Sequence, residues 1–324
     1  IIVQTEVITR SIDLPTVSQE NFFHSSELFK IVEQTSGLKP YMVIVKDKED
    51  RVVAHLFAML RRRWALLPPY LFTQGRVYGE GVYREDVDRQ FVFNLMLKAL
   101  SKCFHSKLCL YIEFSDLSKK MFGYKEFRKN GYFPISWMKI HNSLHSCHPK
   151  ERLSTKYLNR ILRTREPQIK VFETKDVERI KNVYKLLKTY YRFRLQRYLP
   201  SESFFHNVAK SKNGKIFVAT YKEETVGGAL VAVSNNNAYL WYVAAKEKRH
   251  PLLHPTFATV WKTIENAYLS NCRHIYFMNV GLPYRRNRYR DFILGFGGKP
   301  VSTYRWFHFT INWLNKIASW FFRE

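Results

Sequence analysis

The chain is poor in acidic residues and in cysteine, and it has no long uninterrupted hydrophobic run. Of 324 residues, 27 are Asp or Glu and 53 are Lys or Arg, so the formal net charge is +26. The four cysteines, Cys103, Cys109, Cys147 and Cys272, are scattered. Their spacing suggests neither a disulfide framework nor a metal site, so we expect a reducing compartment. No apolar run reaches the roughly twenty residues of a transmembrane helix and no signal peptide is visible, which predicts a cytoplasmic protein.

The shortage of acidic residues is concentrated in the second half of the chain. Residues 1–150 contain 22 Lys and Arg against 15 Asp and Glu, whereas residues 151–324 contain 31 against 12. The positive excess is therefore +7 in the first half and +19 in the second. This excess predicts an anionic partner, which could be RNA, a phosphorylated substrate or an anionic membrane face. A hydrophobic content of 46% is ample for packed cores, and the length suggests two domains.

The stretch Phe277–Phe309 combines an apolar strand, a basic and aromatic loop, a glycine-rich turn and a second aromatic strand. Its glycines supply backbone that needs positive φ or close approach to another group. Arginines and aromatic residues alternate in the loop, a combination that suits an anionic partner. The residues are Arg285, Arg286, Arg288 and Arg290 with Tyr284, Tyr289 and Phe292, and the glycines are Gly281, Gly295, Gly297 and Gly298. The alternative is a solvated loop between two strands.

The predicted elements occur twice in one order: hairpin, strand, helix, strand, glycine turn and closing strand. Tyr124–Phe127 followed by Gly131 parallels Tyr289–Phe292 followed by Gly297, and the closing strands are Ser136–Leu144 and Ser302–Phe309. We interpret this order as a tandem duplication. It predicts a mixed α/β (α+β) protein of two domains, 1–149 and 150–324, each with a mixed central sheet flanked by helices.

This order, the basic segment Leu153–Val171 and the motif YRDFILGFGG at Tyr289–Gly298 resemble the FemABX-like transferases of the GNAT acyltransferase superfamily. The resemblance covers nearly the whole chain and is most specific in that motif. It implies tandem GNAT-like domains and transfer of an acyl or aminoacyl group to an amine. FemABX proteins take amino acids from aminoacyl-tRNA and add them to a peptidoglycan precursor. The implied partners are an anionic donor (tRNA or an acyl carrier) and a cell-envelope precursor as acceptor, and the oligomeric state stays open.

One segment departs from the pattern of acetyl-CoA-dependent GNAT domains. Those domains hold the pyrophosphate on backbone amides of a glycine-containing loop before a helix. The matching segment Lys246–Pro255 (KEKRHPLLHP) has no glycine and two prolines, which lack an amide donor. We therefore expect no tightly bound cofactor and a donor other than free acetyl-CoA. Aminoacyl-tRNA is favoured, and acyl-CoA stays open.

In this fold two central strands separate and open a cleft, and here they would be Ala238–Ala245 and Ile275–Gly281. Aminolysis of an acyl ester needs positioning and a stabilised oxyanion. The candidate catalytic residues are Tyr242, Asn279 and Tyr284. Strand alternation would place Tyr242 on the face of Leu240, and Trp241 on the face of Tyr239. The alternative is that these aromatic residues are core, and nothing supports a covalent acyl-enzyme or a metal.

The predicted helix Asp176–Tyr198 ends in a basic segment that resembles the substrate-facing helix end of the family, with a solvated helix face as the alternative. The candidate substrate-binding residues are Arg192, Arg197, Arg285, Arg288, Arg290, Tyr289, Phe292 and Gly297, and Arg194 lies in the same basic segment. Two competing functions remain: a CoA- or carrier-protein-dependent N-acyltransferase acting on a lipid or sugar, and a non-catalytic RNA-binding protein on the same fold.

The last segment, Ile311–Phe322, has apolar residues at helical spacing, with tryptophans beside them. About twelve residues cannot span a bilayer, but such a helix can lie flat in the interface of an anionic membrane. This interpretation would make the protein peripheral on the inner face of the membrane. The alternative is that the helix packs on its own domain.

Overall fold

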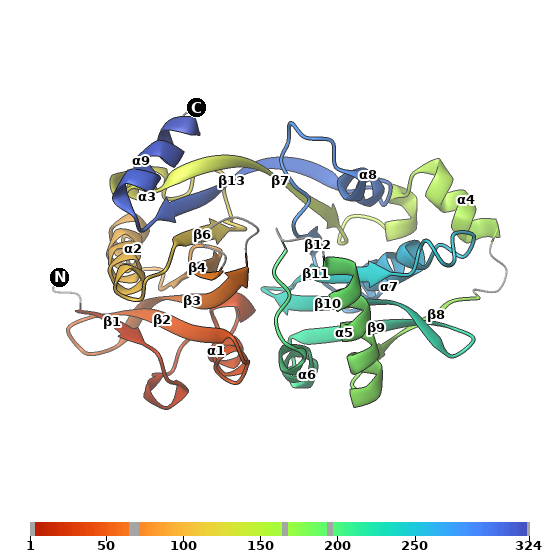
Figure 1. Ribbon diagram of the computed structural model, residues 1–324, viewed down its shortest axis with the longest axis horizontal. Helices are drawn as coiled ribbons and strands as arrows, with labels where there is room; N and C mark the ends of the chain where they lie inside the picture. Colours follow the sequence, from red (N-terminus) through yellow and green to blue (C-terminus); the bar gives the residue numbers. More distant parts are fainter. Residues whose placement is uncertain (1–3, 65–70, 164–167, 193–196, 323–324) are drawn as a thin grey trace. The chain divides into compact units, whose positions relative to one another are not determined.

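The computed structural model describes residues 4–64, 71–163, 168–192 and 197–322. They form two compact units, each a mixed sheet with helices (Figure 1). Unit 1 comprises Ile1–Trp137 with Ser302–Glu324, and unit 2 comprises Met138–Val301. These limits differ from the predicted boundary at residues 149 and 150, which concerns the two halves of the duplication and stays a prediction.

Unit 1 has a sheet in the order β1-β2-β3-β4-β6-β13, with the short β5 paired to β3. β4 and β6 are parallel and are joined by the crossover helix α2, whereas β2 and β3 form an antiparallel hairpin. The strands are β1 (Gln4–Ile8), β2 (Leu38–Lys46), β3 (Val52–Trp64), β4 (Leu71–Tyr78), β5 (Val82–Tyr83), β6 (Tyr111–Ser115) and β13 (Lys299–Phe309). The helices are η1 (Ser11–Asp13), η2 (Phe22–His24), α1 (Ser26–Glu33), α2 (Arg89–Ser106), α3 (Tyr124–Lys129) and α9 (Asn312–Phe321).

Helices α1 and α2 cover opposite faces of the unit 1 sheet. Phe57 of β3 packs against Phe29 of α1, with ring centroids 5.9 Å apart. Its neighbour Leu56 belongs to the buried cluster that contains Met96 of α2. The side chains of successive strand residues point to opposite faces, so this alternation places the two helices on the two sides. Asp88 caps α2 by accepting hydrogen bonds from backbone N–H groups of its first turn, as its position before the helix predicts.

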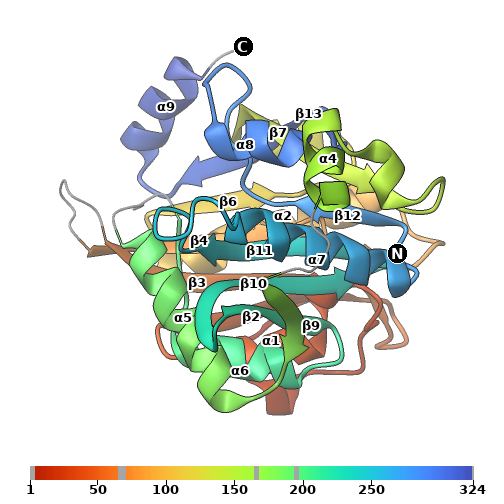
Figure 2. The same ribbon diagram turned by 90° about the vertical axis from the view of Figure 1, so that its right-hand side faces the viewer.

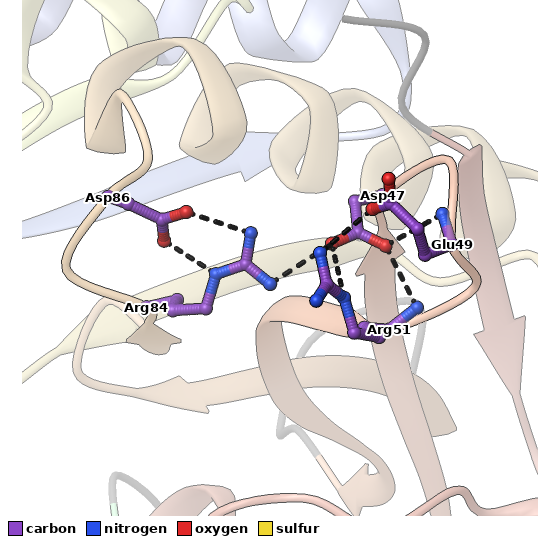
Figure 3. A network of polar contacts seen from close by, with 5 residues as sticks. All are labelled: Asp47, Glu49, Arg51, Arg84 and Asp86. Carbon is purple, nitrogen blue, oxygen red and sulfur yellow. Dashed lines mark hydrogen bonds and ion pairs between the residues drawn. The ribbon is translucent and has the colours of Figure 1, made fainter.

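The turn between β2 and β3 is fixed by charged hydrogen bonds around Asp47 (Figure 3). The Asp47 carboxylate accepts from the backbone N–H of Arg51 at 3.0 Å and from the Arg84 guanidinium at 3.0 Å. Arg84 also donates two bonds to Asp86, at 2.5 and 2.9 Å. Burial acts to raise the pKa of Asp47, but these donors outweigh it and lower the pKa to about 2.

Unit 2 has a sheet in the order β7-β12-β11-β10-β9-β8. β11 and β12 are parallel and are joined by α7, whereas β9 and β10 form an antiparallel hairpin. The strands are β7 (Phe133–Ser143), β8 (Lys170–Thr174), β9 (Gly214–Tyr221), β10 (Glu224–Ser234), β11 (Asn237–Ala245) and β12 (His274–Phe277). The helices are η3 (Pro149–Arg152), α4 (Thr155–Arg163), α5 (Val177–Tyr191), α6 (Glu202–Lys210), α7 (Pro255–Leu269) and α8 (Arg288–Leu294).

Helices α5 and α7 pack on the unit 2 sheet (Figure 2), and two adjacent glycines of β10 let them approach its two faces closely. A Cβ on Gly227 would lie 2.6 Å from the Thr259 hydroxyl of α7, and one on Gly228 would lie 2.5 Å from Val183 of α5. Each contact is shorter than real Cβ atoms tolerate. Helices α5 and α7 therefore cover opposite faces, and the glycines set how closely they approach.

The element order of the duplication recurs in the structure, and the mixed α/β class with two tandem copies of one fold is confirmed. The closing strands are exchanged, however. β7 follows α3 in the chain but pairs with β12 of unit 2, with Ile140 opposite Phe277. β13 follows α8 but pairs with β6 of unit 1, with Trp306 opposite Phe114. Each closing strand therefore completes the sheet of the other half.

Two predicted segments differ in detail. The predicted helix Asp176–Tyr198 is shorter, because α5 ends at Tyr191, and a separate helix, α6, follows at Glu202–Lys210. The predicted basic loop of the second half contains a helix, α8 (Arg288–Leu294). Asn287 starts this helix by accepting a hydrogen bond from the backbone N–H of Arg290 at 3.1 Å.

Candidate active site

The pairing of β11 and β12 stops in the middle of unit 2. Their parallel register runs from Asn237 opposite His274 to Leu240 opposite Phe277, and a last hydrogen bond joins Met278 N–H to the Leu240 carbonyl at 3.3 Å. β11 then continues to Ala245 without β12 beside it. The pairing of the two strands therefore ends in the region where we expected them to separate.

A β-bulge in β11 lies beside this point. Leu230 of β10 pairs with Tyr242 and Val231 pairs with Leu240, so Trp241 has no position opposite it in β10. A bulge interrupts the alternation of side chains. The rings of Trp241 and Tyr242 consequently stack on each other, with centroids 6.0 Å apart, and both contact α6. The expectation that these two residues lie on opposite faces is therefore wrong.

Arg197 links the elements around the separated strands. Its guanidinium donates to the backbone carbonyl of Asn279 at 2.8 Å and lies 5.2 Å from the ring centroid of Tyr289 on α8. It also approaches the hydroxyl of Tyr191, which donates to the Val243 carbonyl of β11 at 3.2 Å. One partly buried cation therefore connects β11, the end of β12 and α8.

The predicted catalytic residues lie in three different surroundings. Tyr242 is 8% exposed, and its hydroxyl donates to the Tyr198 carbonyl at 3.0 Å. Asn279 lies two residues after the end of β12 and has φ of +62°, a left-handed conformation that asparagine tolerates better than most residues. Tyr284 is 67% exposed. The structure thus places Tyr242 and Asn279 at the separated strands and Tyr284 on the loop that follows.

That loop is held by two side chains, Asn287 and Arg290. Arg290 donates to the backbone carbonyls of Leu282 at 2.6 Å and Arg285 at 2.8 Å. Asn287 donates to the Val280 carbonyl at 3.0 Å, and a Cβ on Gly281 would clash with its amide nitrogen. Arg290 therefore braces the loop. Asn287 was not among the residues predicted from the sequence, although an asparagine directly before a helix is a common capping signal.

Three other predicted arginines lie at the surface. Arg285 and Arg288 are exposed on the loop and the first turn of α8, and Arg192 is exposed directly after α5. Arg194 lies outside the described residues. The predicted contact of Arg285 and Arg288 with an anionic substrate stays a prediction.

The glycine turn after α8 is shaped by the segment around α4. The Tyr157 hydroxyl donates to the Phe292 carbonyl at 3.0 Å, and a Cβ on Gly295 would lie 2.5 Å from the Tyr157 ring. Gly297 has φ of +84°, and a Cβ there would clash with the backbone carbonyl oxygen of Arg152. Phe292 packs with Phe296 at a centroid distance of 5.3 Å. Phe292 and Gly297 thus have packing roles, and their predicted contact with substrate stays a prediction.

A carboxylate of the chain itself, that of Glu247, lies at the N-terminus of α7. The Glu247 carboxylate accepts from the backbone N–H of Thr256 at 3.1 Å and from the Thr256 hydroxyl at 2.8 Å. It also lies 3.4 Å from Nδ1 of His254, the residue before the helix. The first residue of α7 is Pro255, which has no N–H. A carboxylate of the same chain therefore already occupies a backbone N–H donor and the positive end of the helix dipole of α7.

A groove of about 1140 Å³ lies elsewhere in unit 2, between α4, β8 and α7. Its floor includes Phe257 and Trp261 of α7. Its rim carries Lys156 and Arg160 of α4, Lys170 of β8 and Lys262 of α7. Lys262 pairs with Glu265 at 3.8 Å, and the Arg160 guanidinium lies 5.0 Å from the Phe257 ring centroid. The groove is therefore apolar at its floor and basic at its rim.

The sequence of this region matches a known family. A family model described as an acetyltransferase (GNAT) domain matches residues 154–286. No protein with a curated description matches the sequence.

Solved structures resemble the whole chain. The structure of FemX is 10% identical and covers 97% of this chain and 100% of its own, with a TM-score of 0.64. A tandem GNAT protein from the clavulanic acid biosynthesis pathway is 9% identical, covers 95% and 99%, and has a TM-score of 0.56. L-PGS from Bacillus licheniformis is 11% identical, covers 93% and 98%, and has a TM-score of 0.55. At these identities the likeness concerns the fold.

The GNAT model covers the separated strands β11 and β12, the bulge and the crossover helix α7, and the fold likeness extends over both units. Residues 154–286 therefore match a GNAT acetyltransferase domain, and the whole chain shares the tandem GNAT-like fold of the FemX structure.

Proposed function

We propose that the protein transfers an aminoacyl group from aminoacyl-tRNA to an amine of a cell-envelope precursor. The observation that carries this choice of donor is Glu247 at the N-terminus of α7. In acetyl-CoA-dependent GNAT domains this position binds pyrophosphate, and a carboxylate already bound there would repel it. The positive charge of residues 151–324 also suits a polyanionic donor.

The reaction is aminolysis of an ester. The amine nitrogen of the acceptor attacks the carbonyl carbon of the aminoacyl ester, a C–N bond forms and the C–O bond to the ribose breaks. The proton lost by the amine ends on the released ribose hydroxyl. We assign the Asn279 amide to stabilise the oxyanion, because the Arg197 hydrogen bond fixes the backbone of Asn279. Tyr242 would act once its hydroxyl has released the Tyr198 carbonyl and formed a hydrogen bond to the substrate. Tyr284 would contact the donor from the loop.

The loop arginines would attract the donor. Arg285 and Arg288 are exposed on a backbone that Arg290 holds in place, so their guanidinium groups are available to phosphates at a fixed position. Arg192 is exposed at the end of α5 and could extend the same contact along the donor. Arg290 and Arg197 would support these contacts by holding the backbone.

The experiment supplies the protein with radiolabelled aminoacyl-tRNA or acetyl-CoA, together with an amine-bearing peptidoglycan precursor or aminated lipid. We expect labelled product from aminoacyl-tRNA. The double variant Arg285→Glu, Arg288→Glu should raise KM for the tRNA about tenfold or more and reduce its salt dependence. Lys185→Glu on the exposed face of α5 is the matched control. Turnover with acetyl-CoA, with micromolar CoA binding by calorimetry at the N-terminus of α7, would overturn the choice of donor.

A second candidate function, transfer of an acyl group from coenzyme A or a carrier protein to a lipid or sugar amine, is favoured by the groove beside α4. An acyl chain suits the floor at Phe257 and Trp261, and the phosphate of a pantetheine arm suits Lys156 and Lys170. Under this alternative, Lys170→Glu abolishes transfer from a long-chain acyl donor and the loop variants do not. Transfer from aminoacyl-tRNA that is insensitive to Lys170→Glu supports the first proposal instead.

The proposed acceptor would be met at the inner face of the membrane. None of the helices in the described part of the chain is long and apolar enough to cross a bilayer. We propose that attachment is peripheral, through a surface of the folded protein.

A further inference from the structure

The helix α9 carries its apolar residues outward. None of its residues is buried. Trp313 is 65% exposed, Trp320 is 64% and Phe321 is 73%. Together with Ile317, at 49%, they follow the spacing i, i+4, i+7 and i+8, which places them on one face of the helix. In a helix that packs on its own domain this face would be covered.

The orientation of α9 is fixed by polar contacts on its inner side. The Asn315 amide oxygen accepts from the backbone N–H of Phe309 at 2.9 Å, and the amide nitrogen donates to the Gly131 carbonyl at 2.8 Å. At the end of the helix, Phe322 stacks on Phe133 with centroids 5.8 Å apart. Asn315 on the inner side of α9 therefore hydrogen-bonds to the rest of unit 1. Turning the apolar face inward would break these hydrogen bonds.

Further apolar surface continues from α9 within unit 1. The Thr310 N–H donates to the Leu110 carbonyl at 3.1 Å, so the start of α9 lies beside the turn before β6. Leu108 on that turn is 88% exposed, and Ile311 is 41% exposed. We call the exposed side chains of Leu108, Ile311, Trp313, Ile317, Trp320 and Phe321 the C-terminal apolar surface. Soluble proteins rarely leave such a contiguous group uncovered without a binding role.

The surroundings of this surface are strongly basic. Gly131 follows α3 directly, and its carbonyl also lies 3.1 Å from Nδ1 of His308, so the ends of α3 and β13 adjoin α9. Burial and the nearby His105 at the end of α2 lower the pKa of His308, so the end of α2 is also close. The exposed cations on these helices and the turn include Lys102, Lys107, Lys125, Arg128, Lys129 and Lys316. Against them, the described residues of α2, α3 and α9 include one acid, Glu126.

We propose that the C-terminal apolar surface docks unit 1 onto an anionic phospholipid bilayer. Tryptophan favours the headgroup boundary, and apolar side chains on one helical face can insert while the surrounding lysines and arginines meet anionic headgroups. A second copy of the chain suits the surface less well, because both copies would bring the same basic rim together. This inference does not depend on the donor, and it supplies a site of attachment at which a lipid-linked acceptor would be reached.

The test is sedimentation of the full chain with vesicles of phosphatidylglycerol and phosphatidylcholine, compared with phosphatidylcholine alone. We expect binding to the anionic vesicles that weakens as salt is raised. The double variant Trp313→Ala, Trp320→Ala should weaken binding about tenfold or more. Arg128→Glu with Lys129→Glu should weaken it about twentyfold or more. Leu252→Ala, at a 90% exposed leucine of unit 2, and Lys185→Glu with Lys188→Glu on α5 are the matched controls and should bind as the unchanged protein.

A second measurement locates the contact directly. Vesicles with brominated acyl chains should quench the tryptophan fluorescence of the unchanged protein, and this quenching should disappear in the conservative variant Trp313→Phe, Trp320→Phe. Circular dichroism would establish that each variant is folded. The proposal is overturned if the protein fails to bind anionic vesicles at low salt or if the tryptophan variants bind and quench as before. It is also overturned if centrifugation shows a dimer that the tryptophan variants dissociate while vesicles are not bound.

Discussion

Replacing Glu113 by glutamine should strongly destabilise unit 1. Glu113 of β6 is 6% exposed and is bonded to the guanidinium of Arg76 of β4. The Arg305 guanidinium of β13 lies 3.0 Å from the same carboxylate, and the Gln74 amide donates to it at 2.6 Å. The Glu113 carboxylate therefore pairs with arginines of β4 and β13, two strands that come from opposite ends of the chain.

The magnitude follows from removing one partner of a buried ion pair. Such a change typically costs about 3–5 kcal/mol, because the remaining buried charge loses its compensation. This is a large share of the roughly 5–15 kcal/mol that stabilises a typical domain. With a urea m-value of about 2 kcal/mol/M, the unfolding midpoint of unit 1 should fall by about 2 M.

The assay has to separate the two units. Urea unfolding is followed by hydrogen exchange, with the amides of β4 and β6 reporting on unit 1 and those of β10 and β11 on unit 2. The matched control is Glu224→Gln. Glu224 also lies between two cations, 2.7 Å from the Lys246 amine and 2.9 Å from the Arg249 guanidinium, but its side chain is 36% exposed. Surface pairs contribute little, so the control should unfold almost as the unchanged protein does.

Acid titration provides a second check. Burial acts to raise the pKa of Glu113, but Arg76 and Arg305 outweigh it and hold the pKa below its ordinary value. A carboxylate with a lowered pKa stabilises the fold above its unfolded pKa, and this contribution is lost as the pH falls towards the folded pKa.

The reasoning is refuted if Glu113→Gln leaves the hydrogen exchange of the β4 and β6 amides unchanged relative to Glu224→Gln.

Three further predictions concern single positions. Asp47→Asn should flatten the loss of thermal stability between about pH 4 and pH 2, because the folded pKa of Asp47 is about 2; melting temperatures across that range test it. Gly297→Ala should destabilise more than Gly37→Ala, since both have positive φ but a Cβ meets the Arg152 carbonyl at Gly297 and open space at Gly37; equal unfolding midpoints would contradict this. Arg290→Lys should loosen the loop by removing its paired carbonyl bonds, which faster amide exchange at 282–286 and a higher KM for the donor would reveal.

Much of the fold could be predicted from local sequence. Alternation and turn residues gave the hairpins β2–β3 and β9–β10, because a strand with a buried face needs period two. Asp88 caps α2 and Pro255 begins α7; both are local signals, because capping depends on residues next to the helix. The repeated order of elements predicted the tandem fold, since each copy carries its own local pattern.

The candidate site was predictable only in part. Its arginines and glycines stand out in composition, but which guanidinium is exposed and which braces the loop depends on carbonyl groups brought near by folding. Arg290 bonds to carbonyls five and eight residues away, and Arg197 bonds to Asn279, 82 residues away. The bulge at Trp241 also depends on the register against β10, which the sequence of β11 alone does not contain.

The sequence by itself determined most of the strands and helices, apart from α6 and α8, and that the main elements occur in two similar sets. Only the tertiary structure decided that the closing strands are exchanged, so that β13 joins β6 and β7 joins β12. Strand alternation specifies that an edge will be paired but not which strand pairs it, because backbone hydrogen bonds are the same for any partner. The choice is made by side chains that meet only after folding, such as Arg305 with Glu113, which are 192 residues apart in the chain.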